Sequence, residues 1–200
     1  MSTGGGATAQ LCSSSTYGLG YPVLNVDEAG KKSQTWTDGF GRTIEADEPD
    51  TSNNLTIATC STYDLLDNLT QVVQGSETRT YVYDGLSRQT SATEPESGAI
   101  STFYTTSAGA LCSGVSGNAC RITDARSKTT TYAYDTRDRL TSKTFSDSTP
   151  TISYFYDQTS YNGLSISNGL GRRTGMSDGS GATAWSYDPA GNVLTREKKK

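Results

Sequence analysis

Two short clusters of carboxylates come closest, in residue type and spacing, to a catalytic pair. Asp47, Glu48 and Asp50 form one cluster, and Glu94 and Glu96 form the other. Two carboxyl groups about 5–10 Å apart across a cleft can hydrolyse a glycosidic bond. Both clusters adjoin a proline in a turn-like context, which favours solvated loops over the walls of a cleft. A glycoside hydrolase using Asp or Glu is therefore an alternative only, with Glu94 and Glu96 as its candidates.

The absence of histidine removes several other chemistries. The 200 residues include no His, which excludes Ser-His-Asp and Cys-His mechanisms within this chain and zinc sites that use His ligands. The four cysteines form no C-x-x-C pair, so a structural zinc site is not expected. Calcium needs six to eight clustered oxygens, which one acidic residue per turn does not supply. We therefore expect no metal, no cofactor and no catalytic residue.

Cys112 and Cys120 bracket a stretch rich in Gly and Ser. Their spacing allows a disulfide that closes a loop, provided that the chain is exported to an oxidising compartment. The alternative is a pair of unpaired thiols beside a turn. The residues leave both readings open.

The bulk composition favours polar β-structure. Only 32% of the chain is hydrophobic, whereas Tyr occurs 12 times and Thr is abundant, and both residue types favour strands. The formal net charge of −4 disfavours a nucleic-acid partner. No apolar run approaches 18 residues, so no membrane span is predicted. The N-terminus lacks the basic and apolar regions of a signal peptide, which fits an internal piece of a longer protein or another export route.

A repeated Tyr-Asp dipeptide organises the chain. In four of its five copies a second aromatic residue lies two positions before the Tyr, and this spacing of two places both rings on one face of a strand. The Asp that follows can start a turn by accepting main-chain N–H groups. Gly, Asp or Asn three to four residues later suits a positive φ that closes the turn. An Arg-x-Leu-Thr-like segment then begins the return strand, so each unit predicts a β-hairpin.

The repeat gives each of its recurring residues a structural role rather than a chemical one. The aromatic rings are expected to pack between neighbouring strands, the Asp residues to form turns, and the Arg residues to pair with Asp or cover the next strand. These structural positions are Trp36, Asp38, Gly41, Arg42, Tyr63, Asp64, Tyr81, Tyr83, Asp84, Arg88, Tyr132, Tyr134, Asp135, Arg139, Tyr154, Tyr156, Asp157, Gly171, Arg172, Trp185, Tyr187, Asp188 and Gly191.

The spacing of these positions predicts the organisation of the chain. Residues 1–24 form an irregular segment rich in Gly, Ser and Thr, and residues 25–200 form the repeat array, with landmarks near residues 38, 64, 84, 135, 157 and 188. Loop insertions are expected at about residues 110–121 and 158–168, with a degenerate unit around Tyr104 and Gly109. The predicted fold class is all-β, made of repeated antiparallel hairpins in an extended or spiralling sheet, with little or no helix.

The pattern resembles the Rhs repeat, also called the YD repeat. It stands most completely at residues 122–141 and 184–195. In Rhs proteins, wall-associated proteins, toxin-complex components and teneurins, similar repeats wind into a hollow shell, and in bacterial members the shell encloses a C-terminal toxin. The resemblance implies a secreted or cell-surface location. Some members have also been linked to carbohydrate binding.

The expected function is therefore that of a non-catalytic structural segment of such a shell. Its partners would be the remainder of the same repeat array and an enclosed C-terminal effector domain that lies outside this fragment. The alternative is a carbohydrate- or surface-binding module, in which the Tyr and Trp rings stack on sugars. Uncapped edge strands also predict that the isolated segment associates or is only marginally stable.

Overall fold

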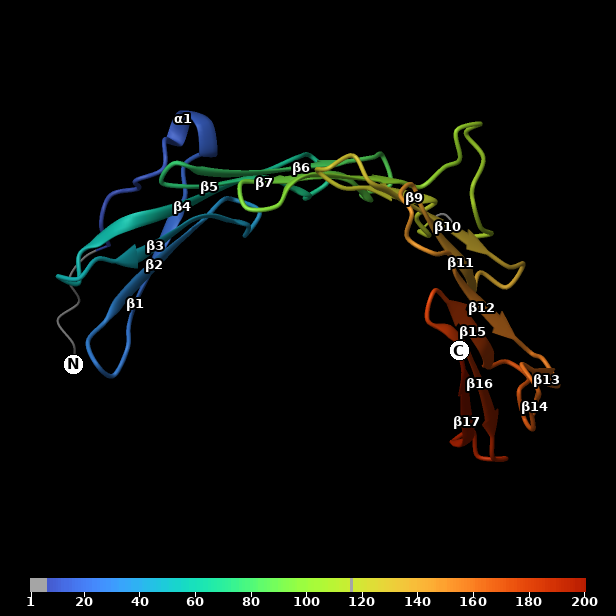
Figure 1. Ribbon diagram of the computed structural model, residues 1–200. Coiled ribbons are helices and arrows are strands. Elements are labelled where there is room, and N and C mark those ends of the chain that lie inside the picture. Colours follow the sequence, from blue (N-terminus) through green and yellow to red (C-terminus); the bar gives the residue numbers. More distant parts are fainter. Residues whose placement is uncertain (1–6, 116) are drawn as a thin grey trace. The chain divides into compact units, whose positions relative to one another are not determined.

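The computed structural model describes residues 7–115 and 117–200, and its strands confirm the predicted all-β class (Figure 1). The strand pairs whose register is described are antiparallel, as expected for hairpins joined by short turns. Of the 17 strands in the described residues, 15 follow chain order and two, β13 and β14, form a small hairpin of their own. Within the described residues the one helix is α1, Ser14–Tyr17, which has four residues. The chain divides into two compact units, Met1–Ala99 and Ile100–Lys200.

The first unit is a ladder of strands that each pair with the next along the chain. Its N-terminal segment carries α1 and leads directly into the first strand. The strands are β1 (Tyr21–Val26), β2 (Lys32–Thr37), β3 (Thr43–Pro49), β4 (Leu55–Tyr63), β5 (Leu69–Gln74), β6 (Glu77–Tyr83) and β7 (Gln89–Glu94).

The second unit repeats this arrangement with two longer connections. One runs from β8 to β9, and the other joins β12 to β15 and contains the small hairpin. The strands are β8 (Gly98–Phe103, which begins at the boundary), β9 (Arg121–Thr123), β10 (Thr129–Tyr134), β11 (Leu140–Phe145), β12 (Ile152–Tyr156), β13 (Ser160–Tyr161), β14 (Leu164–Ser165), β15 (Arg173–Asp178), β16 (Gly181–Tyr187) and β17 (Val193–Lys199).

Each Tyr-Asp turn is accompanied by a shift in strand register. In β4 and β5, Thr62 pairs with Gln71 whereas Tyr63 pairs with Leu69, so one strand contributes an extra residue next to the turn. In the turns without an insertion, the third residue after the turn Asp supplies the positive φ that such a bulge requires, for example Gly41 at 83° and Asp67 at 65°. The register shift and the positive φ therefore lie together at the turn.

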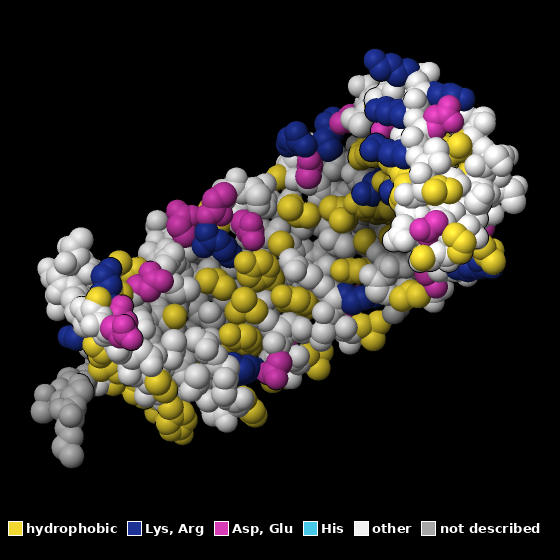
Figure 2. Space-filling model, turned by 90° about the horizontal axis from the view of Figure 1, so that it is seen from below, with side chains coloured by type: hydrophobic (Ala, Val, Ile, Leu, Met, Phe, Trp, Pro, Cys, Tyr) yellow, Lys and Arg dark blue, Asp and Glu magenta, His cyan; other side chains and the backbone are white. Residues whose placement is uncertain are grey.

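The sheets are thin, and hydrophobic side chains form small groups among polar ones on the face drawn in Figure 2. Among the described residues, full burial is concentrated in two places, with Cys120 buried separately in the β8–β9 connection. In the first unit the N-terminal segment covers Gln34, Trp36 and Glu45. Gly20 lies so close there that an added Cβ would come within 2.9 Å of the Trp36 Cβ. In the second unit the β12–β15 connection lies over β15 and β16, where the buried residues are Ile166, Thr174, Ala184 and Ser186.

Three expectations need correction. The segment 1–24 is not wholly irregular, because β1 already begins at Tyr21. The insertion at 158–168 is not a plain loop, because it contains β13 and β14. Asp47 does not lie in a solvated loop, because β3 continues to Pro49 and the side chain of Asp47 points into the covered face with 1% of its surface exposed. The proline that suggested a turn here ends a strand instead.

Candidate functional site: the Tyr-Asp turns

In each repeat turn without an insertion, the Asp organises the turn through one carboxylate oxygen, and Asp38, which follows Thr37 rather than a Tyr, shows the same pattern. Asp38 Oδ1 accepts the main-chain N–H groups of Phe40 at 2.9 Å and Arg42 at 3.0 Å. The main-chain N–H of Asp38 donates to the Arg42 carbonyl at 2.9 Å, which closes the hairpin. The same two carboxylate bonds recur at Asp64, Asp84 and Asp135. At Asp188 the bond from the main-chain N–H of the fourth residue, Asn192, recurs at 2.9 Å. These bonds show how the Asp forms the turn: its carboxylate accepts the N–H groups of the second and fourth residues that follow it.

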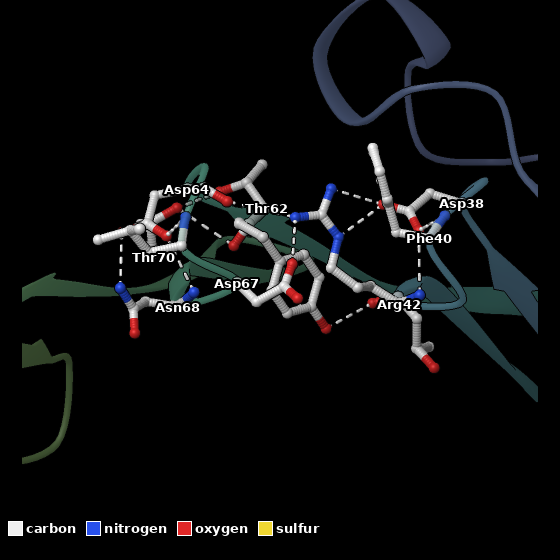
Figure 3. A network of polar contacts seen from close by, with 11 residues as sticks. Asp38, Phe40, Arg42, Thr62, Asp64, Asp67, Asn68 and Thr70 are labelled. Atoms are coloured by element: carbon white, nitrogen blue, oxygen red, sulfur yellow. Dashed lines mark hydrogen bonds and ion pairs between the residues drawn. The ribbon is translucent and has the colours of Figure 1, made fainter. Parts of the chain in front are cut away.

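The second carboxylate oxygen binds the arginine four residues later. Arg42 Nε donates to Asp38 Oδ2 at 2.7 Å, and its Nη1 reaches the next turn, where it contacts the carbonyl of Asp64 at 3.2 Å and Asp67 Oδ1 at 2.9 Å (Figure 3). One guanidinium, with its planar fork of donors, thus connects two successive hairpins.

The tyrosine of the next repeat completes this connection. The Tyr63 ring lies beneath the Arg42 guanidinium, 5.0 Å from ring centroid to Cζ, and its hydroxyl donates to the Thr43 carbonyl at 2.8 Å. A cation over an aromatic face and a hydrogen bond from the ring edge both favour this placement. We call the set of an arginine, the next repeat's tyrosine and the carbonyl after the arginine the turn staple.

The turn staple recurs in the second unit. Arg139 Nη2 contacts Asp157 Oδ2 at 2.7 Å and lies 4.4 Å from the Tyr156 centroid, while the Tyr156 hydroxyl donates to the Leu140 carbonyl at 2.9 Å. Arg172 and Tyr187 form a third copy, in which the ring lies 5.5 Å from the guanidinium and the hydroxyl donates to the Arg173 carbonyl. The repeated arginine and tyrosine side chains therefore bind one another across neighbouring hairpins.

The Asp64 turn departs from this pattern. Asn68 stands where the other turns have arginine, and its Nδ2 donates to Asp64 Oδ2 at 2.9 Å. Its short side chain supports its own turn, but among the described residues it makes no bond to Tyr83 or Asp84 of the next hairpin. Arg88 restores the arginine in the following turn, where its Nε donates to Asp84 Oδ2 at 2.7 Å.

The electrostatics of the turns follow from these bonds. Hydrogen bonds from Asn68 and from main-chain N–H groups lower the pKa of Asp64. The side-chain bond from Arg139 does the same for Asp157. Burial alone would raise the pKa of Asp38, but the hydrogen bonds and charge of Arg42 outweigh it and the net shift is downward. The turn carboxylates are thus held in their ionised form, unlike a general acid.

Two turns are altered in ways that the sequence pattern hides. The Asp157 turn is interrupted by the β13–β14 hairpin and closes only at Arg172, whose carbonyl accepts the Asp157 N–H at 3.2 Å. Asp157 and the motif at Asn168 are therefore two halves of one turn. Around the degenerate unit, Thr106 takes the Asp position, with its N–H donating to the Ala110 carbonyl at 2.8 Å and Gly109 at φ 81°.

The remaining repeat positions lie where strands and turns require them. Gly171 and Gly191 have positive φ values of 76° and 93°. The upstream aromatic residues are half-buried on strands, and several carry a cation over the ring. They are Tyr81 on β6, Tyr132 beside Lys143, and Tyr154 and Trp185 beside Arg173. Tyr134, which precedes the turn Asp, donates its hydroxyl to the Ala119 carbonyl at 2.9 Å.

The carboxylates considered for glycoside hydrolysis are dispersed. Asp50 Oδ1 accepts two main-chain N–H groups of its own turn, at 2.8 and 2.9 Å. Glu96 forms an ion pair with Arg79, and Glu94 accepts the Ser97 hydroxyl at 3.3 Å. Asp47 lies under the N-terminal segment instead. Within residues 7–115 and 117–200 no group of three or more His, Cys, Asp or Glu residues is arranged to hold a metal ion.

All four cysteines are bonded in the structure. Cys112 and Cys120 form a disulfide across the β8–β9 connection, with Cα atoms 5.4 Å apart. Cys12 and Cys60 form a second one, with Cα atoms 5.8 Å apart, which ties the N-terminal segment to β4. The sequence pattern offers no signal for this second pair, because its members lie 48 residues apart and one is outside the repeat.

Comparisons with known proteins agree with this architecture. Residues 116–150 match the family model described as RHS Repeat. The crystal structure of TcdB2-TccC3-Cdc42 aligns with a TM-score of 0.69 at 16% identity, covering 89% of this chain and 10% of that chain. TcdB2-TccC3 aligns with a TM-score of 0.69 at 15% identity over the same shares. TcdB2-TccC3 without its hypervariable C-terminal region gives 0.63 at 16% identity, covering 84% and 9%.

These likenesses confirm the predicted resemblance to Rhs/YD repeats. At this level of identity they establish the fold, and the chain spans about 10% of the length of the chains it matches. No curated protein sequence matches the chain. In the part of the chain that the structure describes, no helix is long and apolar enough to cross a membrane.

Proposed function

From an RHS repeat and the sheet fold of the TcdB2-TccC3 structures, we propose that this chain is a non-catalytic wall segment of a secreted or cell-surface YD-repeat shell. The shell would enclose or present a C-terminal effector domain, and the segment's partners would be that domain and the rest of the array.

One observation carries this proposal: the recurring arginine and tyrosine side chains bind one another in the turn staple. Arg42, Tyr63 and the Thr43 carbonyl bind one another, as do their counterparts around Arg139 and Tyr156. The turn carboxylates have lowered pKa values and donors on both oxygens, which suits a permanent ion pair rather than proton transfer. Such a design supports mechanical continuity from one hairpin to the next.

The alternatives have less support. A sugar-stacking platform needs an open aromatic face. Trp36 is 7% exposed, and the Trp185 ring carries Arg173 at 4.5 Å. A glycoside hydrolase needs two carboxyl groups facing one cleft, whereas Glu96 is paired with Arg79. Neither alternative gains an observation that favours it.

The first test is the reading frame that contains this segment. Further Tyr-Asp units followed by a distinct C-terminal domain are expected. A frame that ends after Lys200 with no neighbouring repeats would overturn the proposal.

The second test is limited proteolysis of the protein encoded by that whole frame. Tyr63→Leu combined with Tyr156→Leu removes two turn staples and is expected to expose the C-terminal domain to protease. Tyr83→Leu, at the turn that follows Asn68 and lacks the staple, is the matched control and should leave protection unchanged. Equal protease sensitivity in the wild type and both variants would contradict a closed shell.

A further inference from the structure

Apart from the Cys12–Cys60 disulfide, the N-terminal segment is held on the sheet mainly through its main chain. Glu45 Oε1 accepts the N–H of Leu11 at 2.7 Å, and Glu45 Oε2 accepts the N–H of Cys12 at 2.9 Å. Both oxygens of one carboxylate thus bind consecutive N–H groups, an arrangement that recognises peptide backbone rather than a particular side chain.

Gln34, on the neighbouring strand β2, also binds the main chain of the segment. Gln34 Oε1 accepts the N–H of Thr8 at 3.0 Å, and Gln34 Nε2 donates to the Thr8 carbonyl at 3.4 Å and to its hydroxyl at 3.2 Å. An amide side chain offers one acceptor and one donor group, as a neighbouring strand would. Gln34 therefore pairs with Thr8 much as another backbone would.

The floor beneath these contacts is buried and preorganised. Gln34 and Glu45 have 0% of their surface exposed. Asp47 Oδ2 accepts Trp36 Nε1 at 3.0 Å and Gln34 Nε2 at 3.3 Å, which fixes the orientation of the glutamine amide. Buried polar groups are costly without partners, so a floor of this kind requires an occupant.

The occupant itself contributes little sequence information. The side chains of Thr8, Ala9 and Leu11 are exposed, and Cys12 is the buried one. Consecutive N–H groups of an extended strand point to opposite sides, so the segment binds Glu45 through a bend at Cys12 rather than as a strand. The floor therefore suits a bent peptide with two consecutive free N–H groups and a small residue at the position of Cys12. Many peptides meet these conditions.

We propose that Gln34 and Glu45 form a peptide-binding groove on β2 and β3 that recognises the main chain of a segment bent in this way. Residues 8–12 are its built-in occupant, and the Cys12–Cys60 disulfide locks that occupant in place. The groove itself, and not only the covalent bond, holds the segment. A separate peptide that adopts the same bend can occupy the groove when the built-in segment is absent.

The first experiment removes the lock in the full chain. In Cys12→Ser combined with Cys60→Ser, amide hydrogen exchange at Leu11 should remain slowed at least about tenfold relative to an unstructured peptide, because charge-assisted hydrogen bonds persist. Adding Glu45→Gln, which turns an N–H donor toward the segment, should abolish that slowing. Adding Glu48→Gln, an exposed neighbour on the same strand, is the matched control and should not change it. Exchange in β5 to β7 reports that the sheet remains folded.

The second experiment vacates the groove. In a full-length variant with residues 7–12 replaced by Gly and Ser, and with Cys60→Ser, a labelled peptide of residues 7–15 carrying Ser for Cys12 should bind saturably. Glu45→Gln should weaken that binding at least about tenfold, and Glu48→Gln should not change it. Loss of Leu11 protection on removal of the disulfide alone, or peptide binding that is absent or independent of Glu45, would overturn the proposal.

Discussion

The first unit contains two regions built from the same hairpin repeat. In the covered region, β2 to β4 lie under the N-terminal segment, and Gln34, Trp36 and Glu45 are buried there. In the bare region, β5 to β7, none of the described residues is fully buried. The difference shows that a thin repeat sheet obtains a local core only where a segment from outside the repeat crosses it.

The contacts between neighbouring hairpins are also more extensive in the covered region than in the bare region. Arg42 ties the β2–β3 hairpin to Tyr63 of the next one, whereas Asn68 leaves the β4–β5 hairpin without that tie to the β6–β7 hairpin. Repeat arrays derive their stability from such neighbour interfaces. We therefore infer that resistance to local opening falls from β2 toward β7.

The largest expected contrast is in pH dependence. Burial is the main cause of the raised pKa of Glu45 in the covered region, and Asp47 adds to it against the N–H groups of Leu11 and Cys12. A group with a raised pKa in the folded state stabilises the fold fully at pH values below its pKa in the unfolded state. That stabilisation is lost as the pH rises through its pKa in the folded state. In the bare region, the Arg88 hydrogen bond lowers the pKa of Asp84. The stabilisation from Asp84 is present at pH values above its pKa in the unfolded state and is lost as the pH falls through its lowered pKa in the folded state.

Acidification should therefore separate the two regions. Between neutral pH and about pH 4.5, exchange protection of the Leu11 and Cys12 amides should hold or increase. Below about pH 4, protection at the Leu86 and Arg88 amides, which bind Asp84, should fall. Amide exchange across a pH series measures both. A parallel loss at all four amides would show that the two regions share one titration.

The Cys12–Cys60 disulfide should give the next largest effect. Its members are 48 residues apart, so the chain-entropy argument assigns it about 4 kcal/mol of unfolding free energy. Urea unfolding of Cys12→Ser with Cys60→Ser, followed by tryptophan fluorescence, measures the loss. Cys112→Ser with Cys120→Ser, which opens a loop with a separation of 8, should cost only about 2.5 kcal/mol. A smaller loss for the first pair would mean that the covered region does not depend on its covalent tie.

Tyr63 should matter more than Tyr83. Tyr63→Leu removes the hydrogen bond to Thr43 and the ring beneath Arg42, which together should cost about 2 kcal/mol. Tyr63→Phe removes only the hydroxyl and should cost about 1 kcal/mol. Tyr83→Leu should cost less than Tyr63→Leu, because its hydroxyl makes no bond to the preceding hairpin within the described chain. Equal losses from urea unfolding would refute a role for the staple.

The fold was predictable because each repeat encodes its own turn. The Asp that accepts N–H groups and the later residue with positive φ are local features, so Asp38 and Gly41 announce a hairpin without tertiary information. Insertions were less visible. The Asp157 turn resumes at Arg172 after a second hairpin, and only the backbone bond between them shows that they belong together.

The site was predictable in its residues but not in its connections. The repeat identifies Arg42 and Tyr63, yet their contact depends on the register between hairpins, which no single repeat states. The buried groove was hidden for a different reason. The sequence placed Asp47 in a solvated loop and gave no signal at Glu45, because the segment that covers them has no distinctive composition and binds Glu45 through its main chain.

The smallest expected effect is also the most direct test of the comparison, because it adds a staple where the chain lacks one. Asn68→Arg places a guanidinium where Arg42 and Arg88 stand in their own turns, four residues after the turn Asp. It should pair with Asp64 and lie over Tyr83, raising the unfolding free energy by about 0.5 kcal/mol. Asn68→Lys is the matched control: it supplies the charge without the planar fork and should gain less. If Asn68→Arg with Tyr83→Leu is as stable as Asn68→Arg alone, the added arginine does not act through the tyrosine, and the staple is not a transferable unit of the repeat.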